Sequence, residues 1–142
     1  MTPSIEAIFV YGTLKPGEAY YQRYCQGSAV SATPAQVQGA LYHLPQGYPA
    51  LTLGEHRVRG SLLHLVKDAN LNEIDRFESY DPTLEPTQNE YQRVALPIFD
   101  LRGQFLESAW VYLMADHKVS RYGGVWLPTG FWSRTLWPSI RP

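Results

Sequence analysis

Glu78 has an unusual place in the segment Asn70 to Pro82, which reads NLNEIDRFESYDP. Leu71 and Ile74 are three residues apart, and Glu78 comes seven residues after Leu71. At about 100° of rotation per residue in a helix, all three side chains fall on one stripe. A carboxylate on the apolar side of a helix loses hydration, which raises its pKa toward the range useful for proton transfer. The pattern therefore indicates Glu78 as a candidate general acid/base.

Two ordinary explanations for Glu78 stay open at this point. The helix could have frayed before it reaches Glu78, or Arg76 or Arg93 could simply pair with the carboxylate. On the pattern alone these explanations are favoured, because perturbed carboxylates are functional only in some proteins.

A second candidate is the loop that follows the apolar run AIFVYG, residues 7–12, and continues as TLKPG. A glycine at the end of a buried strand allows the backbone to turn sharply and to present successive N–H groups, which bind carboxylates and other oxyanions. Gly12, Thr13 and Leu14 are therefore predicted to bind an anion. An ordinary turn that ends at Pro16-Gly17 explains the same pattern and is the commoner case.

The third candidate is a tyrosine pair in GALYHLPQGYPAL, residues 39–51. Tyr42 and Tyr48 lie on either side of a Pro-Gln-Gly turn. Rings beside a rigid turn could form the wall of a pocket, although tyrosines in hairpins are mostly packing residues.

Composition and charge exclude several classes of function. The chain has 12 Lys+Arg against 13 Asp+Glu, a net charge of -1, and no basic run that could follow a phosphate backbone, so no nucleic-acid partner is expected. The N-terminal residues have no positively charged start and only a brief apolar stretch. Neither a signal peptide nor a membrane span is supported, and we expect a cytoplasmic protein.

Cysteine and histidine usage predicts neither a disulfide nor a metal site. Cys25 is the only cysteine, and a lone thiol is more often a small packed residue than a nucleophile. The four histidines do not occur at ligand spacings such as HExxH. No metal is therefore expected.

The elements that must position these residues are mostly strands. Apolar or alternating runs predict strands at residues 7–12, 37–44, 57–66, 91–99 and 108–114, separated by the turn signals PQGYP, LGEH and DLRG. Gly39 and Gly60 lie inside strand patterns and predict bulges or close backbone approach. Short helices are expected over residues 18–27, from a cap at Asn70 or Asp68 to about Tyr80, and around Lys118. With 142 residues, 44% of them hydrophobic, the chain is expected to form one domain over residues 1–142. Its predicted class is α+β, with a small mixed β-barrel and a few short helices.

The segments VYGTLKPG, GALYHLPQGYPAL, IDRFESYDP and EYQRV together resemble the gamma-glutamylcyclotransferase family in order and spacing, over residues 8–114. The resemblance implies that a small-molecule gamma-glutamyl substrate, an amine or amino acid derivative, releases 5-oxoproline without a cofactor. It implies that Glu78, in a D-x-x-E-x-Y pattern, is the acid/base. The implied substrate-binding residues are Tyr11, Gly12, Thr13, Leu14, Tyr42, Tyr48 and Tyr91. The family often has serine where Thr13 stands, and this change keeps the backbone donors.

Two other classes of function stay open. A small barrel could bind a gamma-glutamyl or other amino-acid-like ligand without turnover. A structural interaction domain could use the aromatic tail, which begins at about Lys118 and lies outside the resemblance, as its contact patch. The residues predict neither the leaving amine nor the oligomeric state.

Overall fold

Strands make up most of the fold in the computed structural model, which describes residues 5–66 and 71–134. The strands are Ile5–Val10 (β1), Ala29–His43 (β2), Pro49–Val66 (β3), Gln92–Phe99 (β4), Phe105–Leu113 (β5) and Val125–Trp126 (β6). The α-helices are Leu71–Phe77 (α1) and Asp116–Arg121 (α2). A short π-type helix at Gln22–Gln26 (η1) and a 3-10 turn at Pro86–Gln88 (η2) complete the elements.

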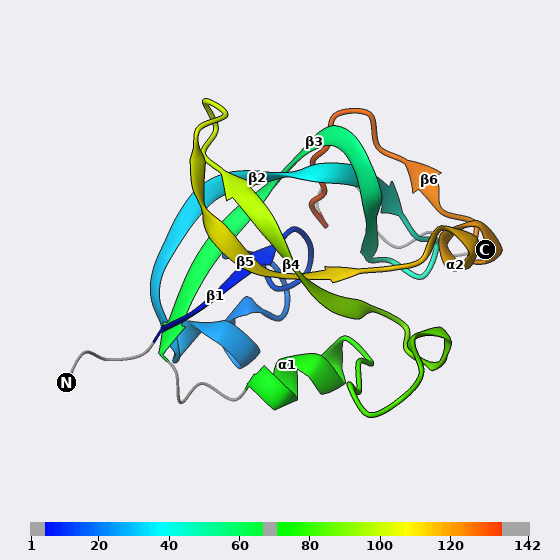
Figure 1. Cartoon of the computed structure of the whole chain (residues 1–142), viewed down its shortest axis with the longest axis horizontal. Helices are drawn as coiled ribbons and strands as arrows, with labels where there is room; N and C mark the ends of the chain where they lie inside the picture. Colours follow the sequence, from blue (N-terminus) through cyan, green and yellow to red (C-terminus); the bar gives the residue numbers. More distant parts are fainter. Residues whose placement is uncertain (1–4, 67–70, 135–142) are drawn as a thin grey trace.

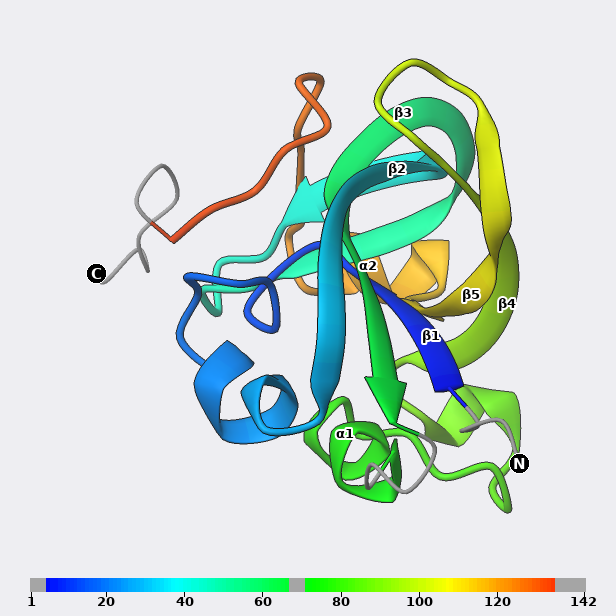
Figure 2. The ribbon, with the colours of Figure 1, turned by 90° about the vertical axis from the view of Figure 1, so that its left-hand side faces the viewer.

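The sheet curls into a partial ring (Figures 1 and 2). Its six strands follow the order β3-β1-β5-β4-β2-β6, and a further pairing of β2 with β3 joins the two sides. The ring is weakest between β1 and β5, which are parallel and share the pair Ile8 and Trp110, and between β2 and β4, which share two pairs. The predicted α+β class is confirmed, while the barrel is only partly ring-like.

Strand β1 is buried on both faces, as its continuous apolar sequence predicts. Phe9 points into the core inside the ring together with Leu41 and Val111, because neighbouring side chains of a strand alternate between faces. Ile8 and Val10 point the other way, into a second core that includes Ile74 of α1. Strand β1 therefore connects the inside of the ring to the helix that carries the candidate acid/base.

The long hairpin of β2 and β3 is longer than the strands predicted for it, because β2 begins at Ala29 rather than Val37 and β3 begins at Pro49 rather than Arg57. The LGEH segment was expected to be a turn, but β3 runs through it as a bulge: Ala40 pairs with Thr52, while Gly39 pairs with His56. At Gly60 an added Cβ would lie 2.2 Å from the Val10 carbonyl oxygen, so the expected close backbone approach is confirmed. The bulge bends the hairpin over the ring.

The helices are shorter than predicted. Only η1 forms within residues 18–27, and α1 ends at Phe77 rather than near Tyr80. The short helix expected around Lys118 is α2. The candidate caps Asp68 and Asn70 lie outside the described residues. No helix in the described ranges has the length and apolar character needed to cross a bilayer.

The aromatic segment after α2 covers one end of the ring. Trp132 is fully buried in the core inside the ring, and its indole Nε1 donates to Nδ1 of His43 at 3.0 Å. Lys15 donates to the carbonyl oxygen of Trp132 at 2.5 Å. These contacts attach the segment to β2 and to the loop after β1.

Candidate active site

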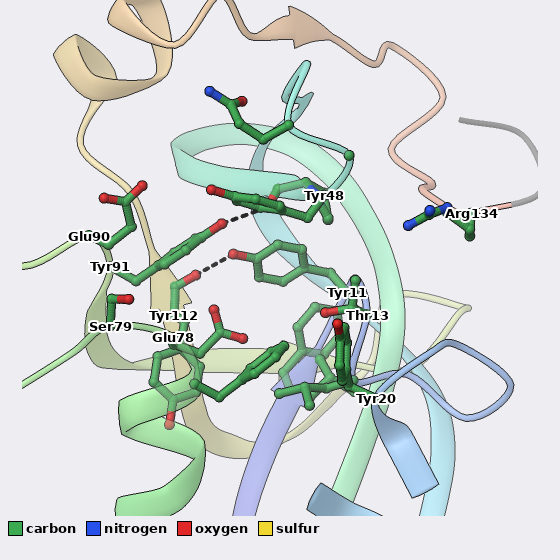
Figure 3. A pocket seen from close by; sticks show the side chains of 17 residues that line it. Tyr11, Thr13, Tyr20, Tyr48, Glu78, Ser79, Glu90, Tyr91, Tyr112 and Arg134 are labelled. Carbon is green, nitrogen blue, oxygen red and sulfur yellow. Dashed lines mark hydrogen bonds between the residues drawn. The ribbon is translucent and has the colours of Figure 1, made fainter. Parts of the chain in front are cut away.

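A pocket of about 350 Å³ opens where the loop after β1, the β2–β3 turn and the end of α1 meet. Its size is within the range of small-molecule sites. Figure 3 shows the side chains around it. Six of the sequence-predicted site residues line the pocket: Tyr11, Thr13, Leu14, Tyr48, Glu78 and Tyr91. Tyr11 and Glu78, which are 67 positions apart in the sequence, thus line one cavity.

Glu78 occupies the C-cap of α1 rather than a position on its core-facing stripe. The helix closes with hydrogen bonds from the Tyr80 N–H to the Asp75 carbonyl and from the Ser79 N–H to the Arg76 carbonyl. This pair is the Schellman motif, in which the residue after the cap is left-handed. Ser79 has a φ of 53°, the one positive φ at a residue other than glycine in the described ranges. The motif turns the chain sharply at the point where the Glu78 side chain faces the pocket.

The surroundings of Glu78 favour its protonated form. Burial and, to a smaller extent, the negative charge of Asp75 together raise the pKa of Glu78 to about 8. The residue retains intermediate exposure because its side chain opens onto the pocket. Within residues 5–66 and 71–134, no group donates a hydrogen bond to its carboxylate. Arg93, one of the partners that sequence reasoning left open, pairs with Asp75 instead, at 3.2 Å.

Two pocket tyrosines have their hydroxyl protons already engaged. The Tyr11 hydroxyl donates to the backbone carbonyl of Tyr112 at 2.5 Å, and the Tyr91 hydroxyl donates to the carbonyl of Pro49 at 2.9 Å. Burial raises the pKa of both phenols well above its ordinary value, so they stay neutral. A phenol whose proton is donated elsewhere has only acceptor capacity left. The two oxygen atoms therefore suit an N–H group or an ammonium ion.

The loop after β1 presents its backbone beside these rings. The Lys15 N–H donates to the Gly12 carbonyl at 3.0 Å, and the Tyr20 N–H donates to the Thr13 carbonyl at 2.9 Å. The N–H groups of Thr13 and Leu14 donate to no other group in the described part of the chain. Gly12 adopts no positive φ. Its requirement for glycine comes from packing, because an added Cβ would lie 2.5 Å from Cγ of Pro49.

Two predicted site residues, Gly12 and Tyr42, are not among the residues that line the pocket. The backbone of Tyr42 pairs with Ala50 on one side and Trp126 on the other. Its partly buried ring packs on the second core, the one that includes Ile74 of α1. Cys25 is buried in the same core, and burial raises the pKa of its thiol to about 12, as expected of a packed residue. The described residues contain no group of three side chains arranged to hold a metal ion.

Sequence reasoning missed several residues of the pocket wall. They are Tyr20, Ser79, Glu90, Tyr112 and Arg134. Tyr112 alternates with apolar neighbours in β5, and Arg134 lies in the segment after α2, so only the folded chain brings them to Glu78. Glu90 is next to Tyr91 and directly follows a turn-rich stretch, and its N–H donates to the Ser79 carbonyl at 3.1 Å. Glu90 is the first residue of EYQRV, and the family resemblance of that segment was the one sequence signal for this part of the pocket.

Comparison with known proteins gives matches over most of the chain. A family model described as "Gamma-glutamyl cyclotransferase, AIG2-like" matches residues 8–134. A protein of Niallia circulans named "Gamma-L-glutamyl-butirosin B gamma-glutamyl cyclotransferase" is 30% identical over 115 residues, which are 81% of this chain and 72% of that protein. The crystal structure of an AIG2-like protein from Mus musculus is 27% identical, with a TM-score of 0.59 over 78% of each chain. The solution structure of protein ytfP from Escherichia coli is 25% identical, with a TM-score of 0.54 over 89% of this chain and 95% of that chain.

Proposed function

Because the chain belongs to the AIG2-like gamma-glutamyl cyclotransferase family, we propose that it releases 5-oxoproline from a gamma-glutamyl amine or gamma-glutamyl amino acid, with Glu78 as the general acid/base. The observation that carries this proposal is that Glu78 and the loop residues Thr13 and Leu14 line the same pocket. A proton-transfer group and free backbone donors are the two components that the reaction requires.

The proposed reaction is an intramolecular acyl transfer. The Glu78 carboxylate takes a proton from the substrate α-ammonium, and the freed amine attacks the γ-carbonyl carbon to form the new C–N bond of the five-membered ring. The tetrahedral intermediate then breaks its bond to the leaving nitrogen, which receives the proton from Glu78. Glu78 takes the second proton from the ring nitrogen and passes it to the released amine, so the products are neutral 5-oxoproline amide nitrogen and an ammonium ion. Nucleophile and electrophile belong to one molecule, so orientation in the pocket supplies much of the rate enhancement. The bonds and protons balance without a cofactor.

The tyrosine oxygens support the position of the α-ammonium in this proposal. Tyr11 and Tyr91 face the pocket with acceptor capacity only, and the pKa of each phenol is raised mainly by burial and in smaller part by the nearby Glu78 charge. An ammonium ion bound between them and Glu78 would be close to its proton acceptor. The same oxygens would repel a carboxylate, so the substrate α-carboxylate is assigned to another wall.

The loop after β1 is that other wall in the proposal. The N–H groups of Thr13 and Leu14 are available to the α-carboxylate or to the oxyanion that forms on the γ-carbonyl. A single oxyanion donor is worth about 2.7–4 kcal/mol in characterised enzymes. Since backbone donors do this work, the side chain of Thr13 need not be serine.

A turnover screen with a matched variant tests the proposed function. The protein and its Glu78→Gln variant are incubated with gamma-glutamyl amines and gamma-glutamyl amino acids, and 5-oxoproline is measured. The parent is expected to release 5-oxoproline from at least one class, with kcat/KM rising as pH increases toward about 8, since Glu78 must be deprotonated to act as base. Glu78→Gln is expected to bind the substrate and release none. Equal rates for the two proteins would exclude Glu78, and binding without release by the parent would favour the binding module.

A further inference from the structure

Asp75 lies three residues before Glu78 on α1, and its carboxylate is held on both sides. Its Oδ1 accepts a hydrogen bond from the Tyr112 hydroxyl at 2.6 Å, and its Oδ2 lies 3.2 Å from a terminal guanidinium nitrogen of Arg93. Asp75 is only 4% exposed. Each carboxylate oxygen thus has its own partner, one from β5 and one from β4, which leaves the side chain a single orientation.

Arg93 is itself fixed by rings. Its guanidinium lies 4.8 Å from the ring centre of Trp110 and 5.7 Å from that of Tyr80. The side chain is 19% exposed, and its Nε is buried with no hydrogen-bond partner in the described residues. Leaving one donor of a buried arginine unsatisfied is costly. A pure stability role would be served as well by apolar side chains, because buried ion pairs contribute little net stability.

The titratable groups around Glu78 determine which charges act on its carboxylate. They are Asp75 of α1, Tyr11 after β1, Cys25 of η1, Tyr48 of the β2–β3 turn, Tyr91 before β4 and Tyr112 of β5. The tyrosines and the cysteine are neutral, since the pKa of each is raised. Glu90 and Arg134 lie farther out on the pocket wall. Arg76, two residues before Glu78, is exposed to solvent, so Asp75 is the buried charged group nearest to Glu78 along α1.

We propose that Asp75 is a positioning residue for Glu78: Tyr112 and Arg93 lock its buried carboxylate three residues before Glu78, at the end of α1, where its negative charge acts on the acid/base. The catalytic meaning of this inference depends on the proposed function, while the effect on Glu78 does not. A two-way proton carrier must hold the proton taken from the α-ammonium until the leaving nitrogen needs it. A carboxylate with ordinary affinity would lose that proton to water at neutral pH.

Two variants change the network in opposite senses. Asp75→Asn keeps the shape and removes the negative charge, so Glu78 should titrate at a pH lower by about one unit or more, the usual effect of a close like charge. Arg93→Met removes the compensating positive charge, so Glu78 should titrate at a higher pH. Arg93→Lys keeps that charge, so Glu78 in this variant should titrate at nearly the same pH as in the parent. Glu55→Gln removes an exposed carboxylate of β3 and serves as the charge-matched control.

The measurement is a carboxyl ¹³C NMR titration of glutamate-labelled protein, in which the Glu78 signal is assigned by its loss in Glu78→Gln. The titration needs no turnover. If the protein never releases 5-oxoproline, the proposed function is excluded, but the titration still tests this inference. In an active protein, the acid limb of kcat/KM should move with the titration midpoint. An unmoved Glu78 midpoint in folded Asp75→Asn overturns the inference. If Asp75→Asn does not fold, Arg93→Met decides, and an unchanged or lowered midpoint there overturns it.

Discussion

Gly12 packs so closely against Pro49 that a side chain at this position would overlap the proline ring: an added Cβ would lie 2.5 Å from Cγ and 2.9 Å from Cδ. Pro49 is also the residue whose carbonyl accepts the Tyr91 hydroxyl. The contact therefore holds together three parts of the pocket wall, namely the loop after β1, the start of β3 and the segment before β4.

Gly12→Ala is expected to disturb this contact and weaken substrate binding. Overpacking of this kind typically costs about 1–3 kcal/mol of stability. KM should rise because the loop and Pro49 must move apart, and the free energy of unfolding should fall in a urea titration. Gly27→Ala is the matched control, since an added Cβ there meets nothing within 4 Å. Identical behaviour of the two variants would show that the contact does not constrain the pocket.

The raised pKa of Glu78 makes stability depend on pH. In the folded protein the pKa of Glu78 is about 8, whereas an unfolded glutamate has its ordinary pKa of about 4.5. Between these values the folded state binds more protons than the unfolded state, so the contribution of Glu78 to stability falls as pH rises from about 4.5 to about 8. Glu78→Gln lacks this contribution. Its stability relative to the parent should increase steadily across that range, as measured by urea unfolding at several pH values. A constant difference would mean that Glu78 titrates normally in the fold.

The Cys25 thiol is expected to resist alkylation in the folded protein. It is 1% exposed, and burial raises its pKa to about 12, so very little thiolate is present at neutral pH. Iodoacetamide should modify the native protein slowly and the urea-unfolded protein quickly, as followed by mass spectrometry. Fast modification of the native protein at pH 7 would reveal opening of η1 and the core beneath it.

How far the sequence predicts the site depends on the residue. The YGTL loop and Glu78 are predicted because turn glycines and misplaced carboxylates leave local signals. Glu78 and three of the loop residues, Tyr11, Thr13 and Leu14, line the pocket, while Gly12 does not. The stripe argument for Glu78 used a helix that continued past Phe77, whereas the residue faces the pocket because the helix ends there. The stripe pattern led to a residue that lines the pocket, but the structure replaces that pattern with a C-cap.

The remaining parts of the site depend on tertiary contacts that leave no local pattern. Arg93 was a candidate partner for Glu78, and only the packing of β4 against α1 pairs it with Asp75. LGEH has the composition of a turn, but pairing along both sides of the bulge continues β3 through it. Tyr42 and Tyr48 looked equivalent around their turn, yet only Tyr48 reaches the pocket. In each case the place of the residue in the curled sheet determined its contacts, and the local sequence does not encode that place.

Ser79 provides a test of whether local strain fixes Glu78. Its φ of 53° is unfavourable for any residue with a Cβ, by about 1–2 kcal/mol, whereas glycine adopts it freely. Glycine also loses more entropy on folding, by about 0.5–1 kcal/mol, so Ser79→Gly should raise the free energy of unfolding by up to about 1 kcal/mol. Ser79→Ala keeps the strain and should give no gain. Because glycine lets the C-cap sample other directions, Ser79→Gly should also lower kcat for a turned-over substrate, although the protein is more stable. A variant with higher stability and undiminished kcat would show that the Schellman turn ends the helix without helping to aim the carboxylate.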